Sequence, residues 1–122
     1  MAALDHIGIY VKDLERSIRF YADLFGFPER KRFSVGESRI AVLDVGGGLL
    51  ELIQRPDAPC EAPRGRWSHV AFHIDGYDGL VSKLEGMELE LRKKTLEDRS
   101  RVAFFKDPDG HDIEVMEKGL GQ

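Results

Sequence analysis

The stretch HIGIYV at residues 6–11 recurs as HVAFHI at residues 69–74, and this recurrence decides the fold. Each copy begins with an imidazole and continues with the alternation that is typical of a half-buried strand. Residues 40–53, which contain three consecutive glycines, match residues 103–116 at the same offset of 63 positions. Self-similarity at one fixed period indicates a duplicated structural unit. We therefore interpret the chain as two copies of one module.

Each copy carries the signals of a strand, a helix and three further strands, with Asp13 as a helix cap and Gly26 as a helix stop. In the first copy we expect strands at 4–11, 29–33, 38–45 and 49–54 and a helix at 13–25. In the second copy we expect strands at 68–74, 88–93, 101–105 and 112–116 and a helix from Asp78 to Gly86. The predicted class is α+β, built from two tandem βαβββ modules with eight strands in total.

Length and composition predict one domain over residues 1–122. The hydrophobic content of 42% and the charged content of 33% are those of an ordinary globular chain. We assign module one to 4–55, a proline-rich linker to 56–66 and module two to 67–118. The lone cysteine, Cys60, falls in the linker and is interpreted as a non-catalytic loop thiol.

Charge and hydropathy exclude several classes of partner. The net charge is −4, with basic and acidic residues spread along the chain, so we expect no nucleic acid partner. No apolar run approaches 18 residues, so we expect no membrane span. The short, uncharged N-terminus does not resemble a signal peptide, and one cysteine cannot form an intrachain disulfide. These features predict a cytoplasmic protein.

The four best candidates for a metal site occupy matching places in the two copies. His6 and His69 are 63 positions apart, and so are Glu51 and Glu114. Any one of the four, taken alone, would be read as an ordinary strand residue, but all four in duplicated frames indicate one four-ligand site. Two imidazoles and two carboxylates balance a divalent ion and suit Ni, Co, Zn, Mn or Fe. An octahedral ion would keep two positions for adjacent substrate oxygens, and Glu114 or Glu51 could accept a proton.

Two longer motifs carry a family resemblance. Residues 6–21, HIGIYVKDLERSIRFY, resemble the opening of the vicinal oxygen chelate superfamily, and residues 105–114, FKDPDGHDIE, resemble its closing motif. That superfamily includes glyoxalase I, methylmalonyl-CoA epimerase, fosfomycin-resistance enzymes, extradiol dioxygenases and bleomycin-binding proteins. By position, His6, Glu51, His69 and Glu114 fall on the four ligands of bacterial glyoxalase I. The fosfomycin enzymes and the dioxygenases use two His and one Glu, so Glu51 argues against both.

Three further residues are candidates for substrate binding: Tyr10, Arg55 and His73. Tyr10 and His73 are repeat mates on the face of the ligand histidines, although a histidine such as His73 is more often a packed or hydrogen-bonded residue than a catalyst. Bacterial glyoxalase I places an Arg and an Asn at the positions of Tyr10 and Arg55 to hold glutathione, which puts glutathione in doubt here. Arg55 could grip a carboxylate or phosphate, or it could be a solvated cation. His111, in the second hairpin turn, is expected to be exposed only.

The resemblance implies a metal-dependent lyase or isomerase of the glyoxalase I type, a homodimer like its relatives. It would shift a proton through a metal-bound enediolate on a small carbonyl or hemithioacetal substrate. Two alternatives stay open: an epimerase similar to methylmalonyl-CoA epimerase, and a small-molecule-binding resistance protein without turnover.

Overall fold

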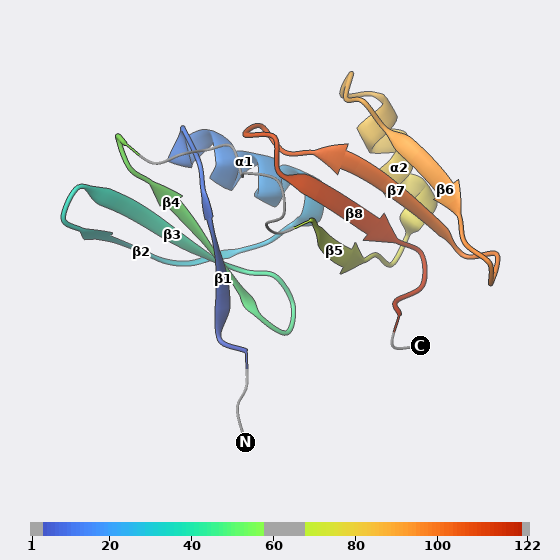
Figure 1. The fold of residues 1–122 in the computed structure, drawn as a ribbon, viewed down its shortest axis with the longest axis horizontal. Helices are drawn as coiled ribbons and strands as arrows, with labels where there is room; N and C mark the ends of the chain where they lie inside the picture. The colour runs from blue at the N-terminus through green and yellow to red at the C-terminus, as the bar shows by residue number, and fades with distance from the viewer. Residues whose placement is uncertain (1–3, 58–67, 121–122) are drawn as a thin grey trace. The chain divides into compact units, whose positions relative to one another are not determined.

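The chain divides into two structural units, Met1–Ala62 and Pro63–Gln122 (Figure 1). The computed structural model describes residues 4–57 and 68–120, so Cys60 and most of the predicted linker lie outside the described residues. Each unit contains one four-stranded mixed sheet and one helix. The predicted α+β class with two βαβββ modules is confirmed.

The first unit places its first strand beside its last. Its elements are β1 (His6–Tyr10), α1 (Leu14–Phe25), β2 (Glu29–Val35), β3 (Ser38–Asp44) and β4 (Leu49–Gln54). The strand order is β1-β4-β3-β2, as Figure 1 shows, and only the β1–β4 pair is parallel. A parallel neighbour needs a crossover connection, and α1 supplies part of it. The strand that carries His6 therefore lies next to the strand that carries Glu51.

Helix α1 begins and ends where the sequence predicts. The Asp13 side chain accepts a hydrogen bond from the Arg16 backbone N–H at 3.1 Å, and Gly26 ends the helix at φ 73°. A positive φ favours glycine because it has no Cβ to clash with the backbone. The helix packs on β3 and β4, and Leu50 and Leu52 are buried there while Glu51, between them, projects from the other face.

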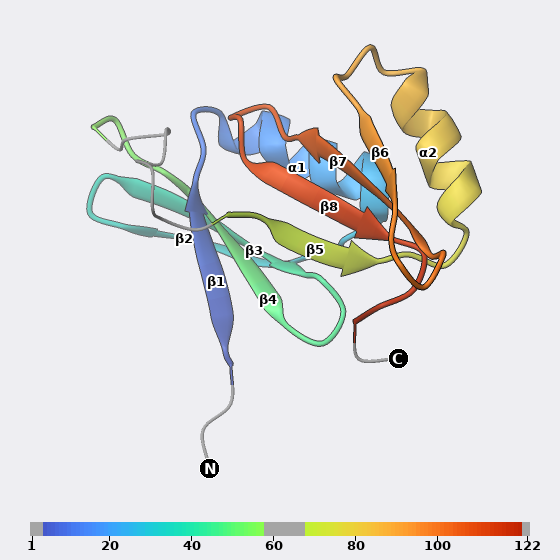
Figure 2. The same ribbon diagram turned by 45° about the vertical axis from the view of Figure 1, so that its right-hand side comes forward.

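The second unit repeats this topology. Its elements are β5 (Val70–His73), α2 (Tyr77–Glu85), β6 (Arg92–Thr95), β7 (Arg101–Lys106) and β8 (Asp112–Met116). The order is β5-β8-β7-β6 with a parallel β5–β8 pair, and Figure 2 shows α2 running beside β6. The strand predicted near 88–93 is wrong in its bounds, since it begins only at Arg92. Glu88 adopts a φ of 57°, and this turn conformation delays the strand.

Among the described residues, no helix is long and apolar enough to cross a membrane.

Candidate metal centre

The first candidate ligand pair is formed by the parallel strands β1 and β4. Gly8 lies opposite Glu51, and His6 lies two residues before Gly8 on the same face. The His6 Nε2 atom is 3.9 Å from the Glu51 Oε2 atom. A Cβ atom on Gly8 would lie 3.5 Å from Glu51 Oε1 and 3.3 Å from Ile53 Cδ1. A Cβ atom at this position would therefore be tight against Ile53 but in ordinary contact with the carboxylate.

The second pair has the same construction in the second unit. Ala71 lies opposite Glu114 in the parallel β5–β8 register, and His69 lies two residues before Ala71. The His69 Nε2 atom is 3.0 Å from Glu114 Oε1, and the Phe104 ring meets the His69 ring edge-on with centroids 5.8 Å apart. Glu114 is buried, with 8% of its surface exposed. A buried carboxylate needs a partner, and His69 provides one.

In each unit, the residue that precedes the histidine contacts its Nδ1 atom. The Asp5 carboxylate lies 2.7 Å from His6 Nδ1, and the Ser68 hydroxyl lies 2.9 Å from His69 Nδ1. The hydrogen bond to Asp5 and the negative charge of Glu51 raise the pKa of His6. In each unit Nδ1 is thus occupied, and Nε2 is the nitrogen that faces the glutamate.

This donor set fits a divalent ion. Two donors about 2.1 Å from one ion and at right angles to each other lie roughly 3 Å apart, close to the 3.0 Å separation of His69 and Glu114. The 3.9 Å separation in the first unit is wider by less than 1 Å. Each pair offers one imidazole and one carboxylate, a mixed donor set that suits Ni, Co, Zn, Mn and Fe.

The predicted substrate residues lie on the same sheet faces as the ligands. Tyr10 is aligned with Ile53 on the Glu51 face, and His73 is aligned with Met116 on the Glu114 face. The Arg55 guanidinium lies over the Tyr10 ring at 5.4 Å and is 3.4 Å from the Asp57 carboxylate. Tyr10 and Arg55 therefore form one amphipathic group with an aromatic base and a cationic tip.

Two cations that the sequence did not reveal lie on the same faces. Lys31 lies opposite Val42, which in turn lies opposite Glu51. Arg92 lies opposite Phe104, which in turn lies opposite Glu114. Each cation lies over an aromatic ring, Lys31 over Phe33 at 5.3 Å and Arg92 over Phe104 at 5.4 Å. The two cations are 61 rather than 63 positions apart, because their partners Val42 and Phe104 are 62 positions apart and each connection along the path is one residue longer in the second unit. A fixed-offset comparison therefore misses the pair.

His111 is half-buried, so the expectation that it would be exposed only is wrong. Its Nδ1 atom lies 2.6 Å from Asp107 Oδ2, and its backbone N–H donates to Asp107 Oδ1 at 2.9 Å. The Asp109 backbone N–H donates to the same oxygen at 2.9 Å. Asp107, Asp109 and His111 could hold a cation by distance alone. The Asp107 oxygens are already engaged by these donors, so this group builds the turn between β7 and β8.

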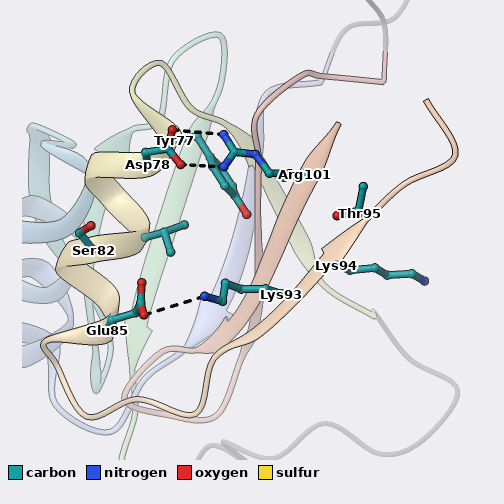
Figure 3. A pocket seen from close by; sticks show the side chains of 9 residues that line it. Tyr77, Asp78, Ser82, Glu85, Lys93, Lys94, Thr95 and Arg101 are labelled. Carbon is teal, nitrogen blue, oxygen red and sulfur yellow. Dashed lines mark hydrogen bonds and ion pairs between the residues drawn. The ribbon is translucent and has the colours of Figure 1, made fainter. Parts of the chain in front are cut away.

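A cavity of about 310 Å³ lies on the helix side of the second sheet, between α2 and the strands β6 and β7 (Figure 3). Tyr77 and Val81 contribute apolar surface to it. Two ion pairs line it: Arg101 with Asp78 at 2.8 Å, and Lys93 with Glu85 at 3.9 Å. Arg101 alternates with Val102 and Phe104 along β7, so the cavity opens on the face away from Glu114.

Residues 3–115 match the sequence model of the glyoxalase/bleomycin resistance protein/dioxygenase superfamily. The chain belongs to this superfamily. Among superfamily relatives, the metallothiol transferase FosB of Lysinibacillus sphaericus is 32% identical over 117 residues, covering 92% of this chain and 79% of the relative. The lactoylglutathione lyase of Schizosaccharomyces pombe is 26% identical and is matched over 93% of this chain and 46% of its own length.

Solved structures agree with the superfamily assignment. The fosfomycin resistance protein FosX from Mesorhizobium loti aligns with a TM-score of 0.75 at 25% identity, over 99% of this chain and 95% of that one. The trypanothione-dependent glyoxalase I of Leishmania major aligns with a TM-score of 0.80 at 24% identity, over 95% and 86% of the two chains. The latter likeness supports the fold, and both names indicate which chemistries superfamily members perform.

Proposed function

We propose that this superfamily member is a metal-dependent lyase or isomerase of the glyoxalase I type. The observation that carries the proposal is the matched pairing of a histidine Nε2 with a glutamate carboxylate in each unit, at 3.9 Å and 3.0 Å. In this proposal the two pairs together hold one divalent ion, with one ion per chain. The two pairs that bind one ion come either from the same chain or from two chains. The fourth donor, Glu51, is what distinguishes this set from a three-ligand set.

The bound ion would stabilise the negative charge that develops on two adjacent substrate oxygens when a neighbouring carbon loses its proton. Glu114 is the candidate proton acceptor, because its carboxylate is buried beside His69. A substrate carbon bound next to the proposed ion would lie within its reach. Glu51 has the matching position and could serve the opposite face of the substrate. Lys31, Arg55 and Arg92 lie on the ligand faces as cations, which favours an anionic substrate.

A metallothiol transferase is the second candidate, because the Lysinibacillus sphaericus protein of that name is 32% identical over most of both chains. Epimerase action on a thioester and binding without turnover complete the set of alternatives. The role of Glu51 separates the candidates. A three-ligand transferase should keep its activity in Glu51→Ala, whereas a four-ligand lyase should lose metal and turnover together.

The test begins with the metal content of the purified protein. We expect one divalent ion per chain in the wild type and little in His69→Ala, since removing a ligand leaves an incomplete site. His73→Asn is the matched control, because His73 lies on the same strand face but is not a proposed ligand. Metal at full occupancy in His69→Ala would contradict the ligand assignment.

Turnover then decides the reaction class. The wild type is assayed with a hemithioacetal, with an acyl-CoA and with fosfomycin plus a thiol, and exchange of the substrate α-proton with solvent is followed by NMR. The proposal predicts isomerisation of the hemithioacetal and α-proton exchange. Activity with fosfomycin plus the thiol but with neither other substrate, undiminished in Glu51→Ala, would favour the transferase. Binding without exchange or product would favour the resistance protein.

A further inference from the structure

The residues that precede the two histidines differ in chemistry although they occupy the same place. Asp5 offers His6 Nδ1 a carboxylate oxygen at 2.7 Å, whereas Ser68 offers His69 Nδ1 a hydroxyl at 2.9 Å. A carboxylate can only accept a hydrogen bond, but a hydroxyl can donate or accept. The nitrogen that carries the hydrogen of a neutral imidazole is set by such a partner. The hydrogen-bond partners of the two Nδ1 atoms therefore favour different tautomers at His6 and His69.

His6 is held in one tautomer. Because the Asp5 carboxylate accepts, the neutral ring carries its hydrogen on Nδ1, and Nε2 keeps its lone pair. That nitrogen faces Glu51 at 3.9 Å, which is too long for a hydrogen bond. A nitrogen lone pair with no hydrogen to remove is the form that binds a metal ion.

His69 is prepared for the opposite tautomer. Its Nε2 atom lies 3.0 Å from Glu114 Oε1, which is a hydrogen-bond distance to a group that only accepts. In the neutral ring the hydrogen is then on Nε2, and the Ser68 hydroxyl donates to Nδ1. Before Nε2 can bind an ion, it must lose this hydrogen and Nδ1 must gain one.

We propose that Asp5 and Ser68 are positioning residues for the two histidine ligands, and that they act in different ways. Asp5 fixes His6 in its metal-binding tautomer before the ion arrives, whereas the Ser68 hydroxyl turns from donor to acceptor as His69 changes tautomer. This inference rests on the proposed metal site. Partners of the second ring nitrogen orient a ligand histidine, and their loss typically weakens metal binding by about 10- to 100-fold.

The tautomers are read directly by long-range ¹H–¹⁵N NMR of the metal-free protein, at a pH where the imidazoles are neutral. We expect hydrogen on Nδ1 of His6 and on Nε2 of His69. After addition of Zn²⁺, which is diamagnetic, both rings should carry hydrogen on Nδ1. In Asp5→Ala the His6 signals should lose the Nδ1–H signature, and in Asp5→Asn they should keep it, because the amide oxygen still accepts.

Zn²⁺ affinity, measured by competition with a chelator, is the second readout. Asp5→Ala should bind about 10- to 100-fold more weakly than the wild type, and Asp5→Asn should recover most of the loss. Ser68→Ala should cost less, since water can replace a hydroxyl in either role. Glu37→Ala is the matched control, because it removes one exposed carboxylate of the same unit in the turn between β2 and β3.

The two possible failures are distinguishable. A wild-type protein that binds no divalent ion would overturn the proposed function, whatever the tautomers are. An Nε2–H tautomer at His6 in the metal-free wild type, or unchanged Zn²⁺ affinity in Asp5→Ala, would overturn the positioning role while leaving the metal site intact.

Discussion

At the scale of single residues, the two glutamates share a register position but differ in environment. The Glu114 side chain is 11% exposed and 3.0 Å from its histidine, whereas the Glu51 side chain is 20% exposed and 3.9 Å from its own. The sequence predicted both pairs through the 63-residue offset. It could not predict which glutamate is the more enclosed, because burial depends on neighbours such as Phe104 that have no counterpart at that offset.

Glu114→Gln is predicted to keep much of the bound metal and lose most turnover. An amide oxygen can still ligate, but it cannot accept a proton at neutral pH. General-base catalysis contributes on the order of 100- to 10,000-fold. Metal analysis and kcat of the same sample check this expectation, with Glu51→Gln as the matched variant and a milder loss expected there. Equal turnover by wild type and Glu114→Gln would remove Glu114 from the mechanism.

Arg55→Ala is predicted to raise KM for an anionic substrate with little change in kcat. The guanidinium lies over Tyr10, beyond the proposed ligands, so we expect it to hold the substrate equally before and during the reaction. Steady-state kinetics measure KM and kcat separately and check this expectation. Arg19→Ala, which removes an exposed cation from α1, serves as the control. A fall in kcat with unchanged KM would instead give Arg55 a role in the chemical step.

His111 is predicted to make stability depend on pH. Burial lowers its pKa, but the hydrogen bond to Asp107 and the charges of Asp109 and Asp112 outweigh burial, so the net shift is upward. A raised pKa means that protonated His111 stabilises the fold below its unfolded pKa of about 6.5, and that this stabilisation is lost as the pH rises through the folded value.

Urea unfolding from about pH 6 to pH 9 measures this dependence around the ordinary histidine pKa. The wild type should lose more stability over this range than His111→Gln. His6 has a raised pKa of the same sign, so the difference between the two proteins, rather than either slope, isolates His111. Parallel curves would count against a contribution from His111.

At the scale of elements, the strands were predictable where apolar alternation and turn residues coincide, as in the hairpins of β3 with β4 and β7 with β8. The bounds of strand β6 were not predictable, because its residues, Arg92–Thr95, are charged or polar and exposed at a sheet edge. Edge strands are often charged, so their sequences lack the apolar pattern that marks a strand. Without that apolar pattern, the sequence does not show that Arg92 lies on the same sheet face as Glu114.

Leu84→Ala is predicted to lower the free energy of unfolding by about 2–5 kcal/mol, because the side chain is fully buried and its removal leaves a cavity. Arg101→Ala should cost less, although Arg101 joins Asp78 on α2 to Glu117, because its side chain is 43% exposed and such ion pairs are weak in water. Denaturant unfolding compares the two, with Ser82→Ala as an exposed control on α2. A greater loss in Arg101→Ala would show that charge, rather than packing, holds the helix.

At the scale of the whole molecule, a βαβββ module alone leaves one sheet face uncovered, so we expect modules to pair within one chain or between chains. Several large apolar side chains of the first unit remain exposed, including Ile7 at 37%, Phe33 at 37% and Val35 at 62%. Sequence periodicity reveals such residues but cannot tell which surface covers them, since alternation is the same for either partner.

A homodimer is therefore predicted at micromolar concentration. Burial of exposed apolar side chains across a self-complementary interface is favourable, and symmetric dimers are the commonest soluble oligomers. Sedimentation velocity over a dilution series checks the mass. A monomeric mass throughout the micromolar range would refute the prediction.

The parallel pairing of β1 with β4 and of β5 with β8 also bears on how such a chain can be rearranged. Each histidine and its glutamate belong to one unit, so a cut within residues 58–67 separates no ligand from its partner. A circular permutant with new ends there and the original ends joined by a flexible tether should retain both half-sites. Each imidazole–carboxylate pair is encoded within one half of the gene. Recombination between the duplicated halves would therefore exchange complete pairs.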